Sequence, residues 1–164
     1  MGVGLRLVRT LPPNGVTAAA VWHNEIHPIA DGFVTTFSFR IVNAGGLSDG
    51  GDGLAFVIRG IGTAPIGSGG GGIGYDGISN CLAVEFDTYL NSDKGDPNDN
   101  HLSIHRSCSS DEAFSIGSTT SNIPNLRDGN IHTVLIEYDG PSNAHQMRVS
   151  VDNTVVLTVP RTFL

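Results

Sequence analysis

Residues 81–101 read CLAVEFDTYLNSDKGDPNDNH, a stretch that begins as a strand and continues as a polar loop. Side chains along a β-strand alternate between its two faces. The polar face carries Glu85, Asp87, Tyr89 and Asn91, and the other face carries Val84, Phe86 and Leu90 with Thr88. Asn, Asp, Gly and Pro then dominate, and these residues form turns. The stretch therefore predicts a strand whose polar face leads into an acidic loop.

Two carboxylates at successive same-face positions predict a bound cation. Glu85 and Asp87 would lie about 7 Å apart along the strand, where they repel each other unless a positive charge intervenes. Asp96 and His101 reach the same place from the loop. Carboxylate oxygens suit calcium, and an imidazole beside carboxylates suits a transition metal. We therefore expect a metal site here, with a solvated acidic turn as the simpler alternative.

The other histidines have no such acidic company, and we expect them to be structural or surface residues. They are His23, His27, His105, His132 and His145.

Length and composition limit the class of protein. The chain has 164 residues, 39% of them hydrophobic, and 22 glycines, which fits one domain with a sizeable core and many turns. Sixteen acidic residues against nine basic ones give a formal charge of -7, which argues against a nucleic-acid partner. No apolar run approaches the roughly 20 residues that cross a membrane. The first ten residues lack the apolar core of a signal peptide.

The two cysteines, Cys81 and Cys108, flank a predicted hairpin. If residues 82–88 pair with 101–107, the register places Cys81 opposite Cys108. A cross-strand disulfide is then geometrically possible and would suit an oxidising compartment. Two free, partly buried thiols are the alternative.

Short alternating segments occupy most of the chain. We expect strands at 5–8, 33–41, 54–58, 101–105, 113–116, 131–138, 146–151 and 154–159. Residues 16–22 are apolar and predict a buried strand, with a helix from Ala18 as the alternative that the short run does not favour. The clearest is 33–41, whose inward residues are Phe33, Phe37, Phe39 and Ile41. Asp152-Asn153 is a hairpin turn signal. No sustained helical period occurs, so the pattern predicts an antiparallel all-β sandwich.

Two motifs suggest other chemistry only weakly. Gly67-x-Gly69-x-x-Gly72 matches a dinucleotide fingerprint by letter but lacks the helix that would hold a pyrophosphate. The run is then a flexible loop, or one whose bare backbone approaches a ligand closely. The pair Glu85 and Asp87 is similar to the carboxylates of glycoside hydrolases, but Tyr89 occupies the next same-face position and a third carboxylate is missing. We therefore expect no catalysis.

Taken together, these segments resemble the legume-type (L-type) lectins, the concanavalin family. Counting from Glu85, the acidic, aromatic, amide and imidazole residues fall at offsets 2, 4, 6, 11 and 16, as in that family's pattern. Residues 52–58, the glycine-rich run 69–75 and residues 128–138 resemble further family segments in the same order. The resemblance covers nearly the whole chain from Leu5. It implies a concanavalin A-like jelly-roll sandwich of two antiparallel sheets.

The resemblance also implies two neighbouring metal ions. Calcium would be held by Asp87, the main-chain oxygen of Tyr89, Asn91 and Asp96. A transition ion, usually manganese, would be held by Glu85, Asp87, Asp96 and His101. Each shared aspartate has two carboxylate oxygens and can bridge neighbouring cations.

The same resemblance places a sugar over the calcium loop. Asp52 would accept hydrogen bonds from two ring hydroxyls, and the Asn91 amide would add another. A backbone amide of the loop Gly70, Gly71 and Gly72 would donate, and Tyr89 would offer an aromatic face. The peptide bond between Gly51 and Asp52 is expected to be cis. The metals would hold the loop in place before sugar arrives, which lowers the entropy cost of binding.

We therefore expect a calcium- and manganese-dependent lectin module that binds glycans or glycoproteins. The alternatives are the same fold serving protein interaction after loss of sugar binding, and a glucanase-like glycoside hydrolase. The chain stops before the family's closing segment, so we expect residues 1–164 to be an incomplete lectin domain. The family implies an extracellular or secreted location, or the secretory-pathway lumen, as a homo-oligomer or within a larger multidomain chain.

Overall fold

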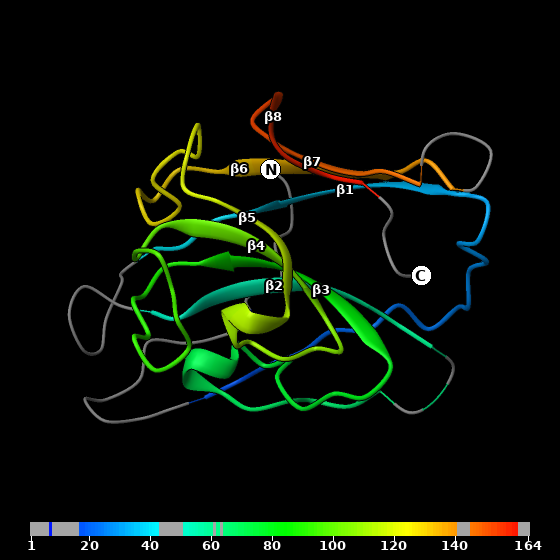
Figure 1. The fold of residues 1–164 in the computed structure, drawn as a ribbon, viewed down its shortest axis with the longest axis horizontal. Coiled ribbons are helices and arrows are strands. Elements are labelled where there is room, and N and C mark those ends of the chain that lie inside the picture. Colours follow the sequence, from blue (N-terminus) through cyan, green and yellow to red (C-terminus); the bar gives the residue numbers. More distant parts are fainter. Residues whose placement is uncertain are drawn as a thin grey trace.

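Two four-stranded antiparallel sheets face each other in the structure (Figure 1), which confirms the predicted all-β sandwich. The computed structural model describes residues 7, 17–42, 51–60, 62, 64–140 and 145–160. One sheet has the order β1 (Phe33–Phe39), β6 (His132–Tyr138), β7 (Met147–Val151) and β8 (Thr154–Val159). The other has the order β2 (Gly53–Arg59), β3 (Cys81–Asp87), β4 (His101–Arg106) and β5 (Ser115–Thr119).

Helical structure within the described ranges is limited to two short 3₁₀ turns in the loops. They are η1 (Gly70–Gly72) and η2 (Glu112–Phe114). No helix in this part of the chain is long and apolar enough to cross a membrane.

Period-2 alternation decides which side chains enter the core between the sheets. In β3 the inward residues are Val84 and Phe86, which are 1% and 0% exposed. The core also receives Leu102 and Ile104 from β4, Val134 and Ile136 from β6, and Met147 and Val149 from β7. Phe37 of β1 stacks on Phe56 and meets the edge of Phe86, with ring centroids 5.9 and 6.1 Å apart. This packing leaves the opposite face of β3 and β4 for polar residues.

The loop between β2 and β3 covers part of that opposite face. Tyr75 and Ile78 of the loop pack with Ala83 and Cys108 in a second, smaller core. Trp22 packs against this cluster, and its indole Nε1 donates a hydrogen bond to the carbonyl oxygen of Pro65 at 2.9 Å. The N-terminal segment is thereby attached to the loop.

Several predicted boundaries need correction. The predicted strand at 16–22 is wrong over its described part, because residues 17–22 pair with no strand and most are exposed. The predicted strand at 113–116 begins at Ser115 instead, since residues 112–114 form η2, capped by the Asp111 side chain. Ile41 lies beyond the end of β1, although it is half-buried as expected. The strand predicted at 5–8 lies outside the described residues except for Leu7, which belongs to no strand.

A disulfide joins Cys81 and Cys108, whose Cα atoms are 5.5 Å apart. The predicted register is wrong by one residue: Asp87 pairs with His101, so Ser107 rather than Cys108 continues the ladder opposite Cys81. Ser107 and Cys108 both adopt positive φ, 61° and 44°, and the chain therefore curls back at the end of β4 to bring the thiol into reach. The bridge is the kind of bond that persists in oxidising compartments.

The hairpin of β7 and β8 turns at Asp152 and Asn153, as the sequence predicts. Both have positive φ, 51° and 66°, which fits the two-residue turn that follows strand twist. The Asp152 carboxylate also reaches His132 of β6, with Oδ2 2.8 Å from Nδ1. Asp128 lies on the other side of this ring, with Oδ1 3.2 Å from Nε2. The expected lack of acidic neighbours around His132 is therefore wrong, and the ring links β6 to the turn between β7 and β8.

Replacing the most central aromatic ring is expected to destabilise the sandwich strongly. Phe86→Ala removes a 0% exposed side chain in contact with Phe37 and Phe39. We expect a loss of about 3–5 kcal/mol in the free energy of unfolding, measured by denaturant titration. Val34→Ala on the same sandwich serves as the control because Val34 is 69% exposed. A loss below about 1 kcal/mol for Phe86→Ala would contradict this assignment of the core.

Stability is expected to fall as pH rises above the ordinary histidine range. Burial lowers the pKa of His132, but the hydrogen bond and charge of Asp152, with the charge of Asp128, raise it overall above 6.5. The folded state therefore favours the protonated ring, and that stabilisation is complete below pH 6.5 and is lost as pH passes the raised pKa. The hydrogen bond from His132 lowers the pKa of Asp152 below 3.8, so its contribution is present above that pH and is lost in acid.

Thermal unfolding of the wild type and His132→Gln from pH 4 to 9 tests this linkage. The wild type should lose stability as pH rises above 6.5, and the variant should show a flatter profile over the same rise. Parallel profiles would rule out His132 as the source of the pH dependence.

Candidate functional site

The polar faces of β3 and β4 bring together ionisable side chains that are almost completely buried. Asp87 pairs with His101 across the two strands, and Glu85 pairs with Ser103. Glu85 and Asp87 are 2% and 1% exposed, and His101 is fully buried. Burying several carboxylates without an opposite charge costs free energy, so a positively charged partner would stabilise this arrangement.

The loop after β3 folds back onto the strand through two backbone hydrogen bonds to carboxylates. The Tyr89 N–H donates to Asp87 Oδ1 at 2.7 Å, and the Asn91 N–H donates to Asp96 Oδ2 at 2.6 Å. The first contact competes with continued strand pairing, and β3 ends at Asp87. Leu90 therefore does not join the apolar face as predicted, and it is 48% exposed.

The folded-back loop brings Asp87, Asp96 and His101 together as possible metal ligands. Each offers one ligand atom within 4.8 Å of the others. All three are predicted metal ligands. A mixed set of carboxylate oxygens and one imidazole nitrogen suits divalent ions, with the nitrogen favouring a transition metal.

The tautomer of His101 fits a ligand role. Its Nδ1 lies 3.0 Å from the Asn98 carbonyl oxygen, which can only accept, so Nδ1 carries the hydrogen. The lone pair of the neutral ring then lies on Nε2, which is buried and makes no hydrogen bond within the described residues, with Glu112 Oε1 3.4 Å away. Backbone carbonyls commonly orient metal-binding histidines in this way.

The side-chain oxygen of Asn91 gives a second sign of the same kind. Oδ1 is buried and also lacks a hydrogen-bond partner within the described part of the chain. Leaving such an atom unsatisfied costs about 1–3 kcal/mol, which a bound cation would remove. Two predicted ligands thus have buried side-chain atoms that make no hydrogen bond with the described residues. The residues present therefore fit a metal.

Electrostatics at the site also favour a cation. Burial raises the pKa of Asp87 to about 9, and the charges of Glu85 and Asp96 add to this effect against the hydrogen bond from Tyr89. Burial also raises the pKa of Asp96. Burial lowers the pKa of His101, but Glu112 and the Asn98 carbonyl raise it overall. The site therefore holds an excess of buried negative charge that divalent cations would compensate.

Glu85 lies outside the group of three. Its Oε2 accepts a hydrogen bond from the Tyr75 hydroxyl, and His105 Nε2 lies 3.0 Å from the same oxygen. Burial, together with the Glu85 charge, raises the pKa of Tyr75, so the hydroxyl keeps its proton for this bond. The role of Glu85 as a metal ligand stays a prediction.

Three residues of the site were missed by sequence reasoning: Tyr75, His105 and Glu112. His105 is fully buried beside Glu85, so its expected lack of acidic company was wrong. The alternation of β4 could have found it, because His101, Ser103 and His105 share a face. Glu112 accepts from the Ser103 hydroxyl, and its Oε1 lies 3.4 Å from His101 Nε2. Tyr75 and Glu112 arrive on loops, and nothing in their local sequence marks them.

The residues predicted to contact sugar converge beside this acidic group. The Gly51–Asp52 peptide bond is cis, as expected. Burial raises the pKa of Asp52, while a hydrogen bond with the Asn91 side chain lowers it. A Cβ added to Gly71 would lie 2.8 Å from the Asn91 side chain, and one added to Gly51 would lie 2.8 Å from Tyr89 Cβ. Bare backbone is therefore required at both contacts.

The remaining glycines of the loop lie in or next to η1. Gly70 has a positive φ of 61°, and Gly72 is buried against Ser68 and Asp76. Lys94 Nζ lies 3.4 Å from Asp76 Oδ2 and joins the glycine-rich loop to the loop after β3.

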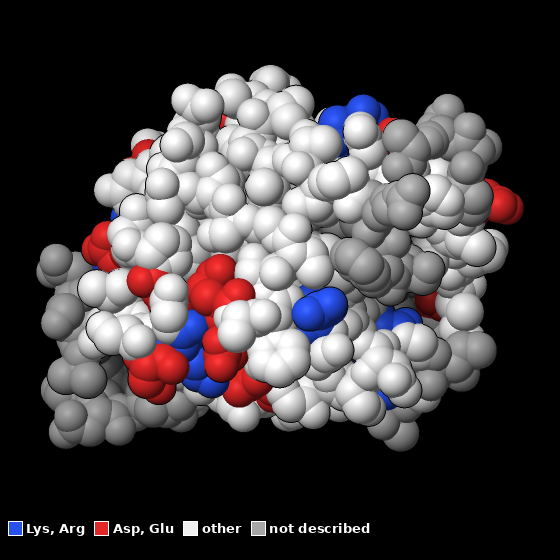
Figure 2. Space-filling view, viewed as in Figure 1, with Lys and Arg blue, Asp and Glu red and all other residues white. Residues whose placement is uncertain are grey.

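The outer surface of this region is strongly acidic. Figure 2 shows Asp and Glu side chains gathered with a few Lys and Arg over the part of the molecule where η1 and η2 lie. A shallow depression of about 410 Å³ lies beside the loop after β3, lined by Tyr89, Leu90, Pro97, Asn98, Asp99 and Arg127. Tyr89 thus borders both this depression and the Asp52 region.

Residues 18–162 match the family model of the legume lectin domain, and the chain belongs to this family. The chain is 39% identical over 126 residues to the L-type lectin-domain containing receptor kinase VIII.1 of Arabidopsis thaliana, covering 74% of this chain and 17% of the kinase. It is 30% identical over 143 residues to a lectin of Pisum sativum, covering 82% of this chain and 48% of that lectin.

Solved structures agree with the concanavalin A-like fold. Winged bean acidic lectin complexed with methyl-α-D-galactose has a TM-score of 0.57 and 28% identity, covering 80% of this chain and 53% of that chain. The chain therefore spans about half the length of the lectins that it matches.

Divalent cations are expected to stabilise the purified protein. Adding Ca²⁺ and Mn²⁺ at 100 times their dissociation constants should add about 2.7 kcal/mol per independent site to the free energy of unfolding. Scanning calorimetry with and without a chelator measures the change. Asp87→Asn should abolish the response, and Asp93→Asn, an exposed change on the loop after β3, should preserve it. An unchanged melting temperature in the wild type would contradict the fit of the site to metal.

Proposed function

We propose that this chain is a carbohydrate-binding module whose sugar site is organised by bound metal. The observation that carries the proposal is the convergence of Asp52, Gly71 and Asn91 at the loop that follows the acidic strand β3. Asn91 belongs to both sets, because its side chain contacts Asp52 and its buried Oδ1 makes no hydrogen bond with the described residues.

The metal ligands follow the family pattern residue by residue. Calcium is held by Asp87, the main-chain oxygen of Tyr89, Asn91 and Asp96. A transition ion, usually manganese, is held by Glu85, Asp87, Asp96 and His101. The bare Nε2 of His101 and the short separations within Asp87, Asp96 and His101 support this assignment. The ions supply positive charge and fixed coordination, and the module carries out no reaction.

The two polar groups of the Asn91 side chain have different roles, because an amide oxygen accepts and an amide nitrogen donates. With Oδ1 bound to calcium, the Nδ2 group remains to donate a hydrogen bond to a sugar hydroxyl. Asp52 accepts from two ring hydroxyls, and a backbone N–H of the loop Gly70, Gly71 and Gly72 donates. Tyr89 places its aromatic ring against the C–H face of the sugar. A ligand with two adjacent free hydroxyls fits this set of donors and acceptors.

The partners are glycans or glycoproteins in an extracellular or secreted setting, or in the secretory-pathway lumen. The Cys81–Cys108 disulfide supports an oxidising compartment. Residues 1–164 form a lectin domain, which we take as incomplete because it spans about half the length of matched lectins. A single shallow sugar site binds weakly, and repetition in an oligomer or a larger parent chain would supply avidity.

Sugar binding is expected to require both the metals and Asp52. On a glycan array, the wild type should bind in Ca²⁺ and Mn²⁺, lose binding in chelator and regain it when the ions return. Asp52→Ala should lose at least about tenfold in affinity, since it leaves sugar hydroxyls unpaired. Asp93→Ala, an exposed change on the neighbouring loop, should bind as the wild type does.

Other outcomes would separate the competing functions. Binding that is indifferent to chelator would sink the metal-dependent mechanism. Normal binding by Asp52→Ala would show that sugar lies elsewhere. Hydrolysis of β-glucans by the purified chain would favour an enzyme instead.

A further inference from the structure

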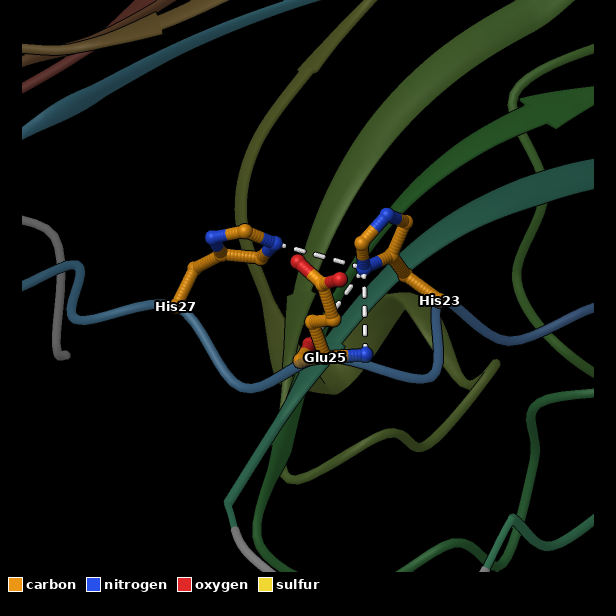
Figure 3. A group of neighbouring side chains, drawn as sticks. All are labelled: His23, Glu25 and His27. Atoms are coloured by element: carbon orange, nitrogen blue, oxygen red, sulfur yellow. Dashed lines mark hydrogen bonds between the residues drawn. The ribbon is translucent and has the colours of Figure 1, made fainter.

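A second group of possible metal ligands lies outside the site described above. His23, Glu25 and His27 stand on the segment that precedes β1, and all three are exposed. One ligand atom from each lies within 4.8 Å of the other two. Figure 3 shows the Glu25 carboxylate lying between the two imidazole rings.

A bend in the chain creates this group. Residues four apart in an extended strand lie about 13 Å from each other. The chain bends at Asn24 and Glu25, and the imidazole centroids of His23 and His27 come within 4.9 Å. The Glu25 N–H donates to His23 Nδ1 at 3.3 Å, and an ion bound to the same Nδ1 lone pair would replace this hydrogen bond. Convergence therefore depends on local backbone shape and not on spacing alone.

The segment is anchored on both sides of the group. Trp22, immediately before His23, packs on the second core and donates to the Pro65 carbonyl. After His27, a turn in which the Gly32 N–H donates to the Ile29 carbonyl at 3.1 Å leads into β1, whose pairing with β6 fixes that side of the segment. Ligands held between two attachment points lose less conformational freedom on binding an ion.

The distances fit a tetrahedral ion. Zinc–nitrogen bonds of about 2.0–2.1 Å place neighbouring ligand atoms about 3.3 Å apart. His23 Nδ1 and His27 Nε2 are 3.2 Å apart (Figure 3). Two imidazole nitrogens with one carboxylate form a ligand set that favours zinc, copper or nickel over calcium.

We propose that His23, Glu25 and His27 form a surface site for a divalent transition metal, with zinc as the test ion. The site is independent of the sugar site and of the proposed function. Three protein ligands leave a fourth tetrahedral position, which water fills on the exposed side.

The test counts zinc on protein whose other metal site is already filled. The full chain is first equilibrated with Ca²⁺ and Mn²⁺, and zinc is then titrated by calorimetry with elemental analysis of the dialysed product. The wild type should take up one zinc equivalent more than His23→Ala or His27→Ala. Asn24→Ala, a change within the same bend that removes no ligand, should match the wild type.

Two further measurements test whether zinc binds at these three residues. Zinc should shift the ring-proton NMR signals of His23 and His27 in the wild type, and Glu25→Gln should weaken binding by about tenfold or more. Equal zinc uptake by the wild type and both histidine variants would overturn the proposal. Sugar binding on the glycan array should be the same in His27→Ala and the wild type, so failure of either proposal is recognised separately.

Discussion

The site depends on burying the carboxylates of one strand beside an imidazole. β3 and β4 place their apolar residues between the sheets, and the same alternation forces Glu85, Asp87 and His101 onto the opposite face. That face is not left to water, because Tyr75 and the loop before β3 cover it. Burial then raises the pKa of Asp87 to about 9, and side-chain atoms of His101 and Asn91 are buried without a hydrogen bond from the described residues. The fold therefore buries negative charge that divalent cations would neutralise. The residues proposed to bind sugar lie around the loop that would hold those ions.

Much of this architecture could be predicted from alternation and turn chemistry. The strand at Phe33–Phe39, the turn at Asp152 and the two faces of β3 follow from period-2 patterning. The errors have identifiable causes. Residues 17–22 have strand-like composition but pair with no strand in the part of the chain that the structure describes. The hairpin of β3 and β4 is shifted by one residue because the two positive-φ residues that bring Cys108 back lie outside the ladder.

The site was predictable only as far as local sequence and family pattern extend. The metal-ligand candidates occur in one stretch, so spacing could nominate them, and the family resemblance added Asp52 and the glycine-rich loop. Tyr75 and Glu112 could not be found in this way, because their contacts with Glu85 and His101 depend on how loops cross the sheet. The group of His23, Glu25 and His27 was missed for a similar reason: a bend, rather than a strand or helix period, brings the side chains together.

The disulfide has a consequence for assembly of the metal site. Cys81 and Cys108 are separated by 27 positions, and all six proposed ligands, from Glu85 to His101, lie between them. An unfolded but oxidised chain therefore keeps every one of these ligands within a single covalent ring. Ring closure raises the effective concentration of each ligand for the others. In the oxidised chain, the ligands therefore meet one another within a single ring that residues 81 and 108 close.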